Sequence, residues 1–169
     1  ETANDRSTVD VVKPKELGLF VDALKAKGIR VVAWYLPGFV KPSLDVRRTR
    51  AMLSFRTPNG AAFDGVALDI ESLRLKSVGL RTTRLLALSR ILRAEAGETP
   101  IAAITYPSRG FERHPTWWPN FPWQQLTGLW PPAPPYDWAA RCGAPARAAI
   151  AAGDDEALVA FPTSDDGRL

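Results

Sequence analysis

The chain has 169 residues, of which 46% are hydrophobic and 24% charged, a balance typical of one globular domain with a hydrophobic core. The formal net charge of +4 is modest and the arginines form no dense basic block, which argues against a nucleic-acid-binding protein. Cys142 is the only cysteine and His114 the only histidine, which excludes an internal disulfide and any cysteine- or histidine-rich metal site. Chemistry must therefore rest on carboxylates, hydroxyls and aromatic groups. No apolar run approaches the roughly 18 residues of a membrane span.

The beginning of the chain predicts a helix, a strand and a second helix in turn. Residues 1–13 show no clear periodicity. Residues 13–28 then carry apolar side chains at helical spacing and end at a glycine, which predicts a helix. The apolar run at residues 29–37 lies between breakers and predicts a buried strand. Residues 43–55 predict another helix with Ser43 as its N-cap.

The same alternation continues to about residue 108. Residues 65–71, "GVALDIE", predict a second buried strand, and residues 79–97 predict an amphipathic helix that stops at Gly97. Residues 100–108, "PIAAITYPS", predict a third buried strand. Continuous apolar strands that alternate with helices indicate an α/β fold with a parallel sheet covered by helices.

Two sheet architectures fit this pattern, an open doubly wound sheet and a (β/α)8 barrel. No glycine-rich phosphate loop follows any predicted strand, so we favour the TIM-barrel type. A complete barrel needs about 250 residues, and only three strands are clear, so we predict an incomplete barrel in residues 1–129. Residues 130–169 are dominated by Ala, Pro, Gly, Asp and Arg, and we expect a loosely ordered tail or a non-native continuation there.

The strand predicted at residues 65–71 ends in two acids, Asp69 and Glu71. Because side chains alternate along a strand, both acids share one face with Ala67, while the larger aliphatic residues share the other. In a barrel the acidic face would emerge at the mouth, with the two Cβ atoms roughly 6–7 Å apart. Two partly desolvated carboxylates this close cannot both ionise easily, so one pKa should rise, as a general acid requires.

The stretch "FDGVALDIE" resembles the signature of family 18 glycoside hydrolases, which ends the fourth strand of their barrel. Asp64, Gly65, Asp69 and Glu71 match that signature, and Ala67 stands in place of its middle aspartate. The D-x-E ending is also similar to that of family 25 lysozymes and other glycosidase-like barrels. The resemblance implies that Glu71 protonates the glycosidic oxygen. It also implies that Asp69 orients and stabilises a substrate N-acetyl group acting as internal nucleophile.

Aromatic side chains near the strand ends are candidates for stacking on sugar rings. By alternation we place Tyr35 on the inward face of its strand and Trp34 on the face toward the helices. Asp64 precedes its strand, where we expect it to support the loop, and Trp123 is expected to begin a helix. The predicted substrate-binding residues are Tyr35, Tyr106, Asp64, Trp117 and Trp118.

These features together predict a glycoside hydrolase that acts on a polysaccharide or oligosaccharide, including one that contains N-acetylhexosamine, if the full barrel is present. We expect no cofactor, no metal, no nucleic-acid partner and no membrane span. A secreted or cell-surface location is a hypothesis, and the oligomeric state is left open.

Three alternatives to that hydrolase remain at this point. The acids would merely cap the next helix or pair with arginines such as Arg74. The domain would be a non-catalytic carbohydrate-binding module or a vestigial barrel fragment. Asp69 and Glu71 would instead hold Mg²⁺ in a lyase or phosphodiesterase barrel.

Overall fold

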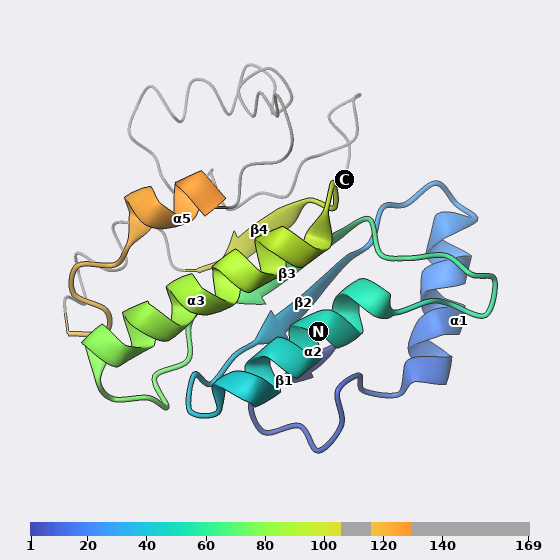
Figure 1. The fold of residues 1–169 in the computed structure, drawn as a ribbon. Coiled ribbons are helices and arrows are strands. Elements are labelled where there is room, and N and C mark those ends of the chain that lie inside the picture. The colour runs from blue at the N-terminus through green and yellow to red at the C-terminus, as the bar shows by residue number, and fades with distance from the viewer. Residues whose placement is uncertain (106–115, 130–169) are drawn as a thin grey trace.

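The structure, a computed structural model, describes residues 1–105 and 116–129, and it is built on a parallel sheet of four strands in the order β1-β2-β3-β4 (Figure 1). The predicted α/β fold with a parallel sheet is confirmed. The strands are β1 (Ala3–Asn4), β2 (Val32–Leu36), β3 (Gly65–Asp69) and β4 (Ile101–Ile104), and the helices are α1 (Pro14–Lys25), α2 (Pro42–Ser54), α3 (Val78–Ala96) and α5 (Trp123–Leu129).

β1 is the element that the sequence did not reveal. It is only two residues long, so it carries no alternation to detect, and it exists because it pairs with the end of β2. Thr2 extends this pairing, since its backbone N–H and its hydroxyl both donate to the carbonyl oxygen of Trp34. Tertiary pairing therefore creates a strand here from a segment without a local signal.

The helix boundaries follow the local chemistry, with one correction. α2 begins at Pro42, whose missing N–H suits the first turn, and its N-cap is Lys41, so the expected cap at Ser43 is wrong. The hydroxyl of Ser77 accepts a hydrogen bond from the backbone N–H of Leu80 and begins α3. Gly97, with a φ of 55°, ends it as expected.

The core lies between the sheet and the two helices α2 and α3, which pack side by side on one face of the sheet (Figure 1). The larger side chains of β3 point to that face, as alternation predicted. Apolar residues of both helices complete the cluster. Its central members are Val66, Leu68, Ile70, Met52, Leu85, Leu88 and Leu92.

Three helix arginines hold the segments that follow strands. Arg48 of α2, 2% exposed, donates to the carbonyl oxygen of Asn4 at 2.6 Å and to that of Ser7. Arg84 of α3 donates to the carbonyl oxygens of Phe39 at 2.5 Å and Val40 at 3.1 Å. In the same way Arg81 of α3 donates to the carbonyl oxygen of Trp117. These bonds give side-chain donors to backbone carbonyl oxygens at and after the ends of strands.

We expect Arg48→Met to lower the free energy of unfolding by about 2–3 kcal/mol, because the variant removes a charged donor from the carbonyl oxygens of Asn4 and Ser7. Arg47→Met is the matched control one residue earlier on α2. Arg47 is exposed and makes a surface ion pair with Asp10, so its loss should change stability by less than about 1 kcal/mol. Urea unfolding of the two variants checks this, and equal effects would contradict the role given to Arg48.

Candidate functional site

The carboxyl ends of the four strands meet at one edge of the sheet, the edge at which parallel α/β folds bind ligands. A hollow of about 560 Å³ opens there. It is formed by the end of β2, by the segment that follows β1 and by the segment that follows β3. Its lining includes Asn4, Asp5, Arg6, Trp34, Leu36, Ser72, Arg74 and Lys76.

Asp69 ends β3 at this edge and is 6% exposed. Burial raises the pKa of Asp69 to about 6, and the negative charges of Glu71 and Glu1 push the pKa in the same direction. The backbone N–H of Glu71 donates to Oδ1 of Asp69 at 3.2 Å and partly opposes the rise. The rise expected for one carboxyl of the pair therefore falls on Asp69.

Glu71 is half-buried and follows Asp69 in the segment between β3 and α3. The interpretation of the two acids as helix caps is wrong, because Ser77 caps α3. Pairing with Arg74 is also wrong, since that guanidinium binds Asp5 at 3.0 Å. Within residues 1–105 and 116–129, no ion pair joins Asp69 or Glu71 to a cation.

The register of β2 and β3 decides which aromatic residue lies on the face of the acids. Trp34 pairs with Ala67 and Tyr35 pairs with Leu68, so Trp34 shares the face of Asp69 and lines the hollow. The expected orientation of both aromatics in β2 is therefore wrong. Both faces of β2 are apolar, so the sequence held no polar residue to mark the inward one.

Tyr35 points to the helices and is fully buried. Its hydroxyl donates to Oδ1 of Asp45 in α2 at 2.6 Å. Burial, together with this hydrogen bond, raises the pKa of Tyr35 far above its ordinary value, and burial also raises the pKa of Asp45. Tyr35 is thus a structural residue between sheet and helix, and it is not available to a sugar at the strand ends.

Asp64 lies at the other end of β3, before the strand begins. Its Oδ1 forms an ion pair with Nζ of Lys25 at 2.7 Å, and its Oδ2 accepts the backbone N–H of Val31 at 2.7 Å. Burial opposes ionisation, but these hydrogen bonds and the nearby positive charge lower the pKa of Asp64 overall. As expected, Asp64 supports a loop, and the structure does not bring it to the substrate-binding candidates.

Trp118 belongs to the core and not to a sugar-stacking surface. The side chain is 2% exposed, and its Nε1 donates to the hydroxyl of Thr82 at 2.9 Å. The guanidinium of Arg81 lies 4.2 Å from the ring centre, which covers the aromatic face. Trp117 is half-buried beside it. Tyr106 lies outside the described residues.

The described part of the chain, residues 1–105 and 116–129, contains neither a metal-binding group nor a membrane-spanning helix. Within it, no three His, Cys, Asp or Glu side chains converge as a metal-binding group. None of its helices is long and apolar enough to span a bilayer.

Asp69→Asn should change how stability depends on pH. The pKa of Asp69 is about 6 in the fold against an ordinary 3.8, so the folded chain binds more protons than the unfolded chain in that interval. The resulting stabilisation is complete below about pH 4 and is lost as pH rises through about 6, by about 3 kcal/mol in all. The neutral variant lacks this loss, so its stability relative to the parent chain should increase between pH 4 and pH 8.

Asp64→Asn is the matched control at the opposite end of β3. The pKa of Asp64 is lowered, so its stabilisation is present above the unfolded pKa and lost as pH falls. This loss lies below about pH 4, because the ordinary pKa of Asp64 is 3.8 and the fold lowers it further. Urea unfolding between pH 4 and pH 8 should therefore show a constant stability of Asp64→Asn relative to the parent chain, whereas Asp69→Asn gains relative stability as pH rises. An equal gain of relative stability in both variants would contradict the raised pKa of Asp69.

Comparison with known proteins finds no family model, no curated protein and no solved structure that matches this chain. The parallel α/β sheet alone implies no particular activity, because many functions share such folds. Function must therefore be argued from the residues at the carboxyl edge.

Proposed function

We propose that the chain is a glycoside hydrolase built on part of a (β/α) barrel and acting on a polysaccharide. Strand order supports the barrel. In a doubly wound sheet the order reverses at a switch point, whereas these four strands follow one another in sequence, and α2 and α3 both lie on one face of the sheet (Figure 1). A barrel needs this arrangement, and the functional residues then lie where the strands end.

The observation that carries the proposal is the pair Asp69 and Glu71 beside the hollow. Glu71 supplies the proton to the glycosidic oxygen, in a segment that leaves its carboxyl free of any ion pair with a described residue. Asp69, ionised above its pKa of about 6, stabilises the positive charge that develops on the sugar or on its N-acetyl group. Trp34 provides an aromatic side chain in the wall of the hollow.

One observation favours a binding protein without turnover as the second candidate. Ala67, fully buried on the face of the acids, has no carboxyl that could share a proton with Asp69. A site in which burial alone sets the pKa of Asp69 would then bind a sugar chain without cleaving it. The two candidates differ in turnover and not in binding.

Hydrolysis of soluble N-acetylhexosamine oligosaccharides by the parent chain is the direct test. We expect Glu71→Gln to lower kcat by about 10²–10⁴-fold, because the amide cannot donate the proton, while binding measured by calorimetry is kept. Asp64→Asn, at the opposite edge, should leave kcat within about twofold. Binding without turnover in the parent chain would support the second candidate and reject the first.

The pH profile of the same reaction gives a second readout. Since Asp69 must be ionised, kcat/KM should rise with pH through about 6, the pKa set by burial. In Asp69→Asn the residual activity should lack this acidic limb. An unchanged limb in that variant would assign the titration to another group.

A further inference from the structure

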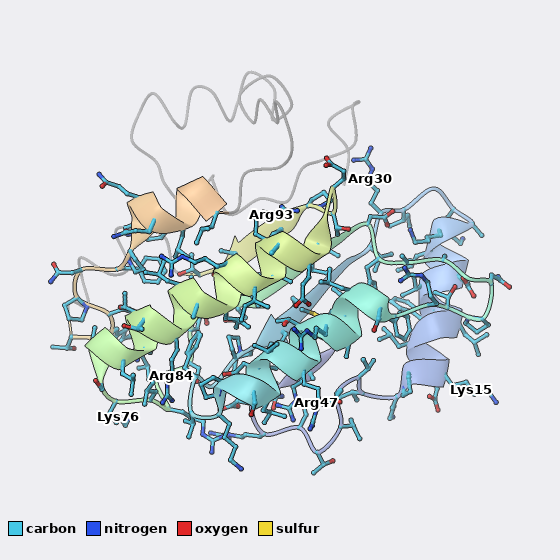
Figure 2. All side chains as sticks on the ribbon, viewed as in Figure 1. Lys15, Arg30, Arg47, Lys76, Arg84 and Arg93 are labelled. Atoms are coloured by element: carbon cyan, nitrogen blue, oxygen red, sulfur yellow. The ribbon has the colours of Figure 1, made fainter. Side chains whose placement is uncertain are left out.

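The hollow has a cationic rim that the hydrolase proposal does not use. Arg6, in the segment that follows β1, and Lys76, in the segment that follows β3, are both exposed. Neither side chain makes an ion pair with another described residue. Figure 2 shows Lys76 at the edge toward which the strands run, with Arg30 at the opposite edge. Two unpaired positive charges therefore face one concave surface at the strand ends.

Arg74 is the third cation of the lining, and its position is fixed. Its Nη1 donates to Oδ2 of Asp5 at 3.0 Å and to the carbonyl oxygen of Asp5 at 3.3 Å. This bond links the segments after β1 and β3 and neutralises Asp5, whose side chain is only 8% exposed. The Nε and Nη2 donors of Arg74 have no partner among the described residues, so one side of the guanidinium fork can accept a further anion.

The negative groups near the hollow do not cancel this rim. Asp5 is paired with Arg74, which leaves Glu1 as the other carboxylate of the lining. Asp69 and Glu71 do not line the hollow. An anion held by the rim therefore belongs to a sugar next to the one at which Glu71 donates its proton. Trp34 lines the same hollow and offers a ring for stacking that neighbouring sugar.

We propose that the hollow is a subsite for a sugar carrying an anionic substituent, a carboxylate or a sulfate, bound by Arg6, Arg74 and Lys76. The substrate class is then an acidic polysaccharide, an inference that rests on the proposed glycoside hydrolase function. Arg74 supplies the geometry, because its donors are held by Asp5 before the ligand arrives. Arg6 and Lys76 supply charge that salt can screen.

Calorimetry on the full chain with Glu71→Gln tests this, since we expect the variant to bind without turnover. The ligands are three oligosaccharides of equal length: neutral chitin oligomers, hyaluronan oligomers that alternate N-acetylglucosamine with a uronic acid, and chondroitin sulfate oligomers. We expect an acidic oligomer to bind about 10-fold or more tighter than the neutral one. Raising NaCl from about 50 to about 500 mM should remove most of that difference.

The charge variant is Arg6→Gln with Lys76→Met, and its matched control is Lys15→Met with Arg90→Gln, which removes the same charge from exposed helix positions. Figure 2 shows Lys15 on α1, away from Lys76. The first double variant should lose most of the preference for acidic oligomers, and the control should keep it. All four substituted residues are exposed, so the melting temperatures should stay close to that of the parent.

The outcomes separate this inference from the hydrolase proposal. Preference for the uronic acid alone or for the sulfate alone supports the subsite and identifies the anion. Equal binding of neutral and acidic oligomers, no binding of any of them, or a preference that survives in the Arg6 and Lys76 variant overturns it. Acidic binding by a parent chain that cleaves none of the oligomers keeps the subsite and rejects the hydrolase. Turnover of neutral oligomers alone supports the hydrolase and rejects the subsite.

Discussion

The carboxyl edge of this sheet depends on arginine side chains that capture the carbonyl oxygens of the loops. Arg48, Arg84 and Arg81 reach from α2 and α3 to segments that follow β1, β2 and β4. Burying a guanidinium is unfavourable unless its donors are used, and Nε of Arg48 and Nε of Arg81 have no hydrogen-bond partner among the described residues. The arrangement persists because Arg48 and Arg84 each donate to two backbone carbonyl oxygens and Arg81 donates to one. Arg48 in particular holds Asn4, which lines the same hollow as Trp34 and Arg74.

The acids at the two ends of β3 have pKa values that the fold shifts in opposite directions. Asp64 at the amino end is held by Lys25 and by a backbone N–H, and its lowered pKa contributes to folding at neutral pH. Asp69 at the carboxyl end is buried without a cation among the described residues, and its raised pKa destabilises the fold at neutral pH. A carboxyl kept in that unfavourable state is typical of functional sites. The contrast makes the carboxyl edge the better candidate for a functional site.

The alternation of side chains predicted the helix-facing side of β3 correctly and that of β2 wrongly, and the difference has a physical reason. In β3 the residues Val66 and Leu68 are large and Ala67 is small, so the helix-facing side could be predicted from the sequence. In β2 both Trp34 and Tyr35 are large, and no local feature ranks them. The hydroxyl of Tyr35 determines that Tyr35 faces the helices, because Asp45 in α2 accepts its hydrogen bond at 2.6 Å. A partner ten residues away across a turn is visible only once the helix packs on the sheet.

By itself, the sequence determined the parallel α/β class, the positions of α1 to α3, the two acids after one strand and the breakers between elements. Periodicity, glycine and proline carry that information locally. Only the tertiary structure decided that β1 exists, that Trp34 and not Tyr35 faces the acids, and that Trp118 is a core residue. It also brought Arg6 and Lys76 to one hollow, 70 positions apart in the sequence. Strand pairing and burial decide these points, since they depend on which distant segments meet.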